Sequence, residues 1–152
     1  MTFILTPNEK KLIKYIINGK KRFRLLNGIY RIHDSYMALL SKRLCITYST
    51  TQNYVTDFKQ RGLVRPVGGN RLKLTETGLK ICKVMNQYAQ QNPYLQCLRR
   101  MSEGLEACIY NAGGEDEVNY AEVNYYNAQF ECVGQLIEEF ELLSAKELTE
   151  KW

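Results

Sequence analysis

A short hairpin inside an otherwise helical sequence most constrains the fold of this chain. Two extended runs, 63–67 and 71–74, are rich in β-forming residues and are separated only by Gly68-Gly69-Asn70. Glycine and asparagine tolerate the positive φ angles of tight turns, so this stretch predicts a β-hairpin. Helical patterns lie on both sides of it. The predicted fold class is therefore mainly α with a small β component.

The first helix is predicted from its capping residues. Thr6 can cap the helix, Pro7 fits the first helical position, and Glu9 completes a capping box. Asn18-Gly19 predicts the end of this helix. The apolar residues between these signals follow a period of 3.6 residues: Leu12, Ile13, Ile16 and Ile17.

Residues 23–32 predict a second hairpin. Asn27-Gly28 stands between β-forming residues and is the strongest short signal for a two-residue turn. Arg22, Arg24 and Arg31 would border this hairpin.

Two helices joined by a tight turn are predicted next. His33-Asp34-Ser35 offers a cap for a helix that runs to about Arg43, with Met37, Leu40 and Leu44 facing inward. Cys45-Ile46-Thr47 forms the turn.

The following helix spans about residues 48–61 and ends at Gly62. Thr51, Val55 and Phe58 fall on one side of it and are predicted to be core. After the hairpin, a further helix is predicted from about residue 76 to Gln91.

The order of these elements is that of a winged helix-turn-helix domain. Residues 39–65, LLSKRLCITYSTTQNYVTDFKQRGLVR, resemble the helix-turn-helix of the MarR-type transcriptional regulators. Leu72-Lys-Leu-Thr-Glu-Thr-Gly78 is similar to the L-T-x-x-G that follows their wing. Small archaeal, plasmid and viral winged-helix proteins are an equally good comparison. The resemblance covers about residues 36–82 and implies a DNA-binding domain, predicted to occupy residues 1–91.

In a module of this kind the helix at 48–61 enters the DNA major groove, and the wing at 65–73 contacts the minor groove or the backbone. The amides of Gln52 and Asn53 can pair with adenine through a donor and an acceptor. Hydroxyl groups at the helix start and basic residues around it suit phosphates. The predicted DNA-binding residues are Tyr48, Ser49, Thr50, Gln52, Asn53, Thr56, Lys42, Arg43, Lys59, Arg65, Arg71 and Lys73.

The net charge of +5 conceals a strong asymmetry. Residues 1–80 carry 16 Lys and Arg against four acidic residues, a balance of +12, and residues 81–152 carry five against 12, a balance of −7. Such a basic half favours a polyanionic partner. The alternative is that the two halves neutralise each other within the chain.

The acidic residues 92–152 form a second predicted domain, a helical hairpin. Apolar residues recur at alternating steps of three and four, which indicates helices with one apolar side. We interpret this element as the interface of a homodimer, with packing onto the chain's own winged helix as the alternative. The predicted dimerisation residues are Leu98, Met101, Leu105, Val123, Tyr126, Phe130, Val133, Ile137 and Phe140.

Two additional roles for this half stay open. Its Met and Tyr residues could line a pocket for a small-molecule effector, although no motif identifies one. Its cysteines could respond to oxidants, although no cluster of cations beside them indicates a lowered thiol pKa.

Other function classes have little support in the sequence. Five scattered cysteines without a C-x-x-C pair, and a single histidine, predict no metal site and no cofactor. Phosphate-binding glycine loops, HExxH and nucleophile elbows are absent, so we expect no enzyme. No run approaches the roughly 20 apolar residues of a membrane helix, and we expect a cytoplasmic protein.

A sequence-specific, dimeric transcription regulator of double-stranded DNA is the leading hypothesis. A sequence-tolerant architectural DNA binder and a winged-helix adaptor for proteins are the alternatives.

Overall fold

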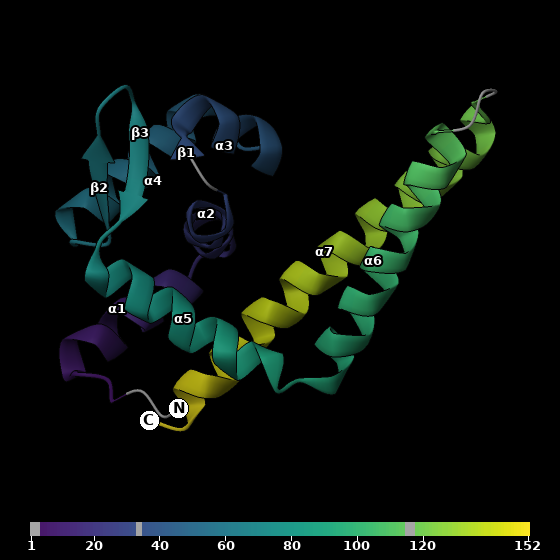
Figure 1. Ribbon diagram of the computed structural model, residues 1–152. Helices are drawn as coiled ribbons and strands as arrows, with labels where there is room; N and C mark the ends of the chain where they lie inside the picture. The colour runs from purple at the N-terminus through teal and green to yellow at the C-terminus, as the bar shows by residue number, and fades with distance from the viewer. Residues whose placement is uncertain (1–3, 33–34, 115–117) are drawn as a thin grey trace. The chain divides into compact units, whose positions relative to one another are not determined.

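A computed structural model of the protein describes residues 4–32, 35–114 and 118–152. These residues form seven α-helices and a three-stranded sheet (Figure 1). The fold is therefore mainly α with a small β component, as predicted. In chain order the elements are α1 (Pro7–Ile17), α2 (Lys20–Arg31), β1 (Ser35–Tyr36), α3 (Met37–Leu44), α4 (Tyr48–Gln60), β2 (Val64–Val67), β3 (Arg71–Leu74), α5 (Glu76–Gln90), α6 (Pro93–Gly113) and α7 (Tyr120–Glu150).

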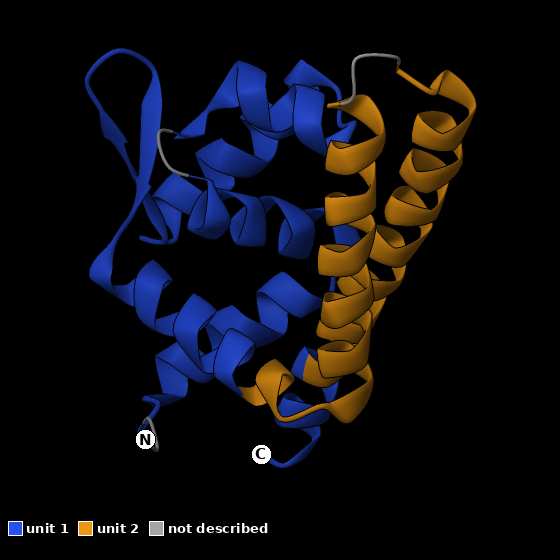
Figure 2. Cartoon of the chain, turned by 45° about the vertical axis from the view of Figure 1, so that its right-hand side comes forward, with its two compact units in different colours: residues 1–87, 145–152 blue, residues 88–144 orange. Residues whose placement is uncertain are grey.

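The chain divides into two compact units, coloured separately in Figure 2. Unit 1 comprises residues 1–87 together with 145–152, and unit 2 comprises residues 88–144. The last turns of α7 thus belong to unit 1, although the sequence grouped them with the acidic hairpin. No helix among the described residues is both long enough and apolar enough to cross a membrane.

The sheet of unit 1 is antiparallel, with β3 between β1 and β2. The predicted hairpin at 63–74 is confirmed, because Val67 pairs with Arg71 across the turn and Val64 pairs with Leu74. Gly69 and Asn70 both have positive φ angles, as a turn this tight requires. The two-residue strand β1 completes the sheet by pairing Ser35 with Leu72.

The predicted start of α1 is confirmed in detail. The backbone N–H of Glu9 donates to the Thr6 hydroxyl (3.2 Å), and the backbone N–H of Thr6 donates to the Glu9 carboxylate (2.9 Å). Lys80 of α5 also donates to this carboxylate, at 2.9 Å. Glu9 therefore caps its own helix and ties α1 to α5.

The predicted hairpin at 23–32 is wrong, because these residues belong to helix α2. Phe23, Leu26 and Ile29 recur at steps of three and are buried, so the helical period outweighs the Asn27-Gly28 turn signal. A Cβ on Gly28 would lie 3.2 Å from the Leu44 side chain. This glycine therefore allows close packing of α2 against α3 rather than a turn.

Helix α3 begins after the short strand β1. The predicted cap at His33-Asp34 lies outside the described residues, and Ser35 belongs to the strand instead. The Ser35 hydroxyl donates to the carbonyl of Ile32 (2.8 Å). Of the residues predicted to face inward, Leu40 and Leu44 are buried and Met37 is half-buried.

Unit 2 contains the antiparallel helices α6 and α7, which lie side by side in Figures 1 and 2. The Tyr94 and Phe140 rings stack with their centroids 6.0 Å apart. The Arg99 guanidinium lies 3.7 Å from the carboxylate of Glu141. Part of the predicted loop between these helices, residues 115–117, lies outside the described residues.

Candidate nucleic-acid interface

The turn between α3 and α4 sets the direction of α4. Cys45 ends α3 in the left-handed region (φ 53°), where non-glycine residues are uncommon. The backbone N–H of Ile46 donates to the Ser41 carbonyl (3.1 Å), and the Ile46 side chain is buried. Thr47 then caps α4 by accepting from the backbone N–H of Thr50 (3.2 Å). The buried Ile46 side chain and the Thr47 cap of α4 thus fix the conformation of this turn.

One side of α4 belongs to the core. Thr51, Val55 and Phe58 are each at most 1% exposed, which confirms the predicted inward side. The Thr51 hydroxyl donates to the Thr47 carbonyl (3.0 Å), so its polar group is satisfied within the helix. Burial of this side requires the opposite side of α4 to face outward.

The outward side of α4 carries uncharged polar groups. At about 100° per residue, Ser49, Asn53 and Thr56 lie close to one line along the helix, and Gln52 lies beside it. These four residues are exposed, and Tyr48 at the helix start is 50% exposed. Five of the six predicted base-reading residues thus share an exposed surface.

Two threonines on α4 have hydroxyls that are already in use. Thr50 is half-buried, and its hydroxyl accepts from the Thr47 hydroxyl (2.8 Å). The Thr56 hydroxyl donates to the Gln52 carbonyl (2.9 Å). Thr50 is therefore part of the helix cap, whereas the Thr56 oxygen keeps a lone pair that can accept a bond from a ligand.

Three basic residues share one face of the wing, the hairpin β2–β3. Arg65 lies directly opposite Lys73 in the ladder, and Arg71 is two residues further along the same face. All three are exposed. Like charges directly opposite each other destabilise a sheet, and an anion lying across them offsets that repulsion. This face is therefore suited to a phosphate backbone.

The exposed Tyr36 also lies on this face, and the sequence pattern did not identify it. It is paired with Arg71, whose guanidinium carbon lies 5.9 Å from the Tyr36 ring centroid. The pairing of β1 with β3 joins residues 35 positions apart, so no local signal could have indicated it.

The wing tip and the end of α4 border a common hollow of about 410 Å³. Lys59 of α4 lines it together with Gly68, Gly69 and Arg71 of the wing. Lys59 at the end of α4 and Arg71 of the wing therefore border the same hollow. Lys42 and Arg43, at the end of α3, are also exposed.

Three arginines outside the predicted DNA-binding set, Arg22, Arg31 and Arg61, have neighbours within unit 1. The guanidinium carbons of Arg61 and Arg22 lie 3.6 Å and 4.4 Å from the centroid of the Tyr15 ring. Arg61 also pairs with Asp57 at 3.4 Å, and Arg31 donates to Asn86 (3.2 Å). These contacts link helices of unit 1 to one another.

The L-T-x-x-G segment fixes the wing to α5. The Thr75 hydroxyl donates to the Gly62 carbonyl (2.6 Å) and accepts from the backbone N–H of Gly78 (3.1 Å). A Cβ on Gly78 would lie 2.1 Å from the carbonyl oxygen of Leu63. The hydrogen bonds of its hydroxyl thus explain the threonine of the motif, and the close approach to Leu63 explains the glycine.

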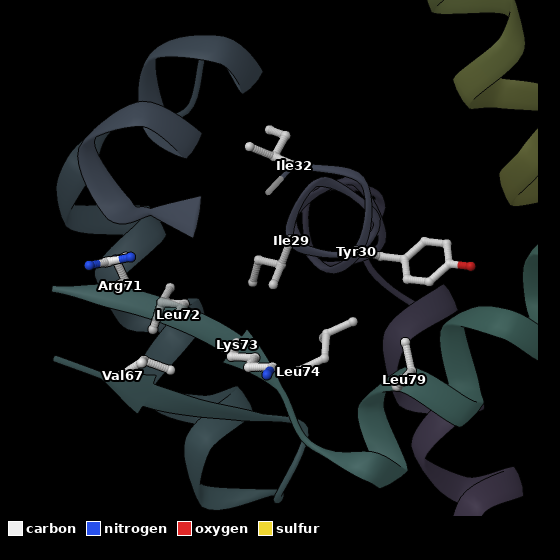
Figure 3. Close-up of a pocket in the computed structure, with 9 residues that line it drawn as sticks. All are labelled: Ile29, Tyr30, Ile32, Val67, Arg71, Leu72, Lys73, Leu74 and Leu79. Carbon is white, nitrogen blue, oxygen red and sulfur yellow. The ribbon is translucent and has the colours of Figure 1, made fainter. Parts of the chain in front are cut away.

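A second hollow, of about 600 Å³, lies beside the wing (Figure 3). Figure 3 shows Arg71 at one end of it and Leu79 of α5 at the other. The described residues that line it are chiefly aliphatic and include no carboxylate, histidine or thiol. This lining favours binding of an apolar group and offers none of those three groups for catalysis.

Among the described residues, no cluster of three His, Cys, Asp or Glu side chains could hold a metal ion.

The predicted dimerisation residues lie mostly between α6 and α7. Val133 is buried and Phe140 stacks on Tyr94, so part of the apolar seam packs within the hairpin. Met101 is 50% exposed and lies on the outer surface. The remaining predicted residues are half-buried: Leu98, Leu105, Val123, Tyr126, Phe130 and Ile137.

Comparison of the chain with models of known protein families and with curated proteins finds no match.

Proposed function

We propose that this protein is a homodimeric winged helix-turn-helix regulator of transcription that binds double-stranded DNA at specific sequences. In this proposal α4 enters the major groove, and the hairpin β2–β3 is the wing on the minor groove or the backbone. The observation that carries the proposal is the contrast between the two opposite sides of α4. One side is fully buried, and the other presents the exposed Gln52 and Asn53, with the exposed Lys59 in the last turn of the helix.

The dimensions and chemistry of this surface suit duplex DNA. The major groove is about 12 Å wide and admits one α-helix with its side chains. An uncharged polar surface can exchange hydrogen bonds with base edges, whereas the cations on the wing and on α3 can contact phosphates. The order of elements and the β1-β3-β2 sheet also agree with the winged-helix pattern.

The proposal places the protein in the cytoplasm. All five cysteines are free. Free thiols are typical of a reducing compartment.

Selection of bound sites from a random duplex pool tests this function most directly. We expect enrichment of one motif, followed by specific binding at physiological salt that is at least about 10³-fold tighter than binding to random duplex. With about six phosphate contacts, log K should fall with log salt at a slope of about −5. Tight binding without an enriched motif would instead indicate an architectural DNA binder. No binding at low salt would refute the proposal.

A further inference from the structure

Arg71 lies in the middle of a row of three side chains on the outer face of the sheet. Val67 of β2 and Tyr36 of β1 are its direct partners in the two ladders. Residues directly opposite each other in an antiparallel sheet point to the same face. Val67 is 38% exposed and Tyr36 is 40% exposed, so this row faces solvent. Arg71 therefore lies between an aliphatic and an aromatic neighbour.

We infer that Tyr36 is a positioning residue, which holds the Arg71 guanidinium on the outer face of the sheet for contact with a DNA phosphate. This inference rests on the proposed function, because it names the residue that prepares one of the wing cations for DNA. It adds strand β1 to the elements that form the interface.

A guanidinium can lie over a ring and bind a phosphate at the same time. The guanidinium carbon of Arg71 lies 5.9 Å from the Tyr36 ring centroid, within the roughly 6 Å of cation–π contacts. A guanidinium that stacks on a ring uses its flat face, and its N–H groups point outward in its own plane. These in-plane groups can contact a phosphate while the ring keeps its place beside the cation.

Positioning before binding lowers the cost of binding. An arginine side chain loses rotamer freedom when it contacts a phosphate, and this loss weakens binding. Neighbours on both sides restrict the rotamers of Arg71 in the unbound protein, so less freedom is lost on binding. Arg65 and Lys73 have each other as partners in the ladder, and their like charges repel.

The start of α3 does not account for a tyrosine at this position. Tyr36 is the N-cap residue of α3, but its side chain makes no capping hydrogen bond. The preferred N-cap residues are Ser, Thr, Asp and Asn. Replacement of the Tyr36 ring should therefore leave the start of this helix intact.

Fluorescence anisotropy with a random duplex of about 20 bp at low salt tests the inference, since phosphate contacts do not depend on sequence. Tyr36→Leu should raise the dissociation constant about two- to tenfold, because Arg71 must then become ordered on binding. Tyr36→Phe keeps the ring and should bind like the wild type. Tyr110→Leu, which removes an 80% exposed tyrosine from α6, is the matched control and should also bind like the wild type.

A double-mutant cycle separates positioning from direct contact with DNA. In an Arg71→Ala background, Tyr36→Leu should have no further effect on the dissociation constant, because the side chain that it positions is gone. An equal loss in both backgrounds would show that Tyr36 acts without Arg71 and would overturn the inference. Wild-type affinity of Tyr36→Leu, or a Tyr36→Phe variant as weak as Tyr36→Leu, would overturn it too.

NMR of the protein without DNA separates this inference from the proposed function. The Nε–Hε signal of Arg71, identified by its absence in Arg71→Ala, should carry a ring-current shift that Tyr36→Phe keeps and Tyr36→Leu removes. The same signal position in the wild type and in Tyr36→Leu would overturn the inference even if DNA binds. A wild type that binds no duplex would refute the regulator and the phosphate contact, whereas a ring-dependent signal would still establish that Tyr36 orients Arg71.

Discussion

At the scale of single residues, contacts that link distant segments hold the wing and α1 in place. Gly78 approaches the Leu63 carbonyl too closely for any side chain. The hydroxyl of Thr75, three residues earlier, bonds both ends of that contact, because it donates to the Leu63 carbonyl and accepts from the backbone N–H of Gly78. Glu9 similarly joins a local helix cap to a long-range ion pair with Lys80. Each of these residues lies at a position where a small chemical change disturbs two elements.

Gly78→Ala should lower the free energy of unfolding by about 1–3 kcal/mol, because the new methyl group forces α5 away from the start of β2. Gly68→Ala is the matched control, since a Cβ there meets no atom within 4 Å and Gly68 is absent from the glycines with positive φ. Urea unfolding followed by circular dichroism measures both. Equal stability of the two variants would contradict the role given to Gly78.

Glu9 predicts a pH-dependent contribution to stability. The backbone hydrogen bond from Thr6 and the bond from Lys80 hold the Glu9 pKa below its ordinary value. A lowered pKa means that the stabilisation is present above the unfolded pKa of about 4.3 and is lost as pH falls through the folded pKa. Glu9→Gln should therefore lower stability at pH 7 by up to about 1 kcal/mol.

This loss should shrink below about pH 4. Thermal unfolding of Glu9→Gln at several pH values measures the difference. The exposed Glu106→Gln is the control, and a Glu9→Gln deficit that persists at pH 3 would contradict the ion-pair account.

At the scale of elements, α4 and the wing divide the proposed work of recognition. The uncharged outer side of α4 can distinguish bases, whereas Arg65, Arg71 and Lys73 on one face of the wing respond to charge alone. Removal of a side chain that contacts a base weakens binding mainly to the matching sequence, whereas removal of a side chain that contacts a phosphate weakens binding to every sequence. Substitutions in α4 and in the wing should therefore have distinguishable signatures.

Asn53→Ala should cost about 1–3 kcal/mol on the selected site and little on random duplex, because a base contact is lost. Arg71→Ala should weaken both duplexes alike and reduce the salt slope by about 1. Fluorescence anisotropy against salt concentration measures these effects, with the exposed Gln87→Ala on α5 as a control. An Asn53→Ala loss that is equal on both duplexes would rule out base reading by α4.

At the scale of the whole molecule, charge is divided along the chain. The basic residues are concentrated before residue 80, and the acidic residues are concentrated in α6 and α7. The proposed homodimer carries two basic surfaces, one from each chain. Two-fold symmetry of such a protein requires two-fold symmetry in the DNA site.

The selected site should therefore be an inverted repeat with half-sites about 10 bp, or a multiple, apart. A duplex with both half-sites should bind more tightly than a duplex with one, because each chain of the proposed dimer contacts one half-site. Titration of duplexes with one and two half-sites measures this gain. A wild type that binds both duplexes equally would argue against dimeric recognition.

Local patterns predicted much of the fold. The cap of α1, the apolar periods of α1 and α4 and the turn of β2–β3 depend on neighbours within a few residues, and these predictions are confirmed. The Asn27-Gly28 prediction is wrong because packing of α2 against α3 decided the conformation. Strand β1 and the position of Tyr36 beside Arg71 depend on pairing across 35 residues, which no local window contains.

The sequence by itself determined which segments are helical or extended in most of the chain, and which side of α4 is apolar. Hydrogen bonding and side-chain period act over three or four residues and are therefore visible in the order of residues. Only the tertiary structure decided that α2 is a helix and that Lys59 of α4 and Arg71 of the wing border one hollow. It also decided that part of the apolar seam of α6 and α7 packs within the hairpin. These features arise from burial and close approach between distant segments, whose free energy depends on surfaces that form only when the chain folds.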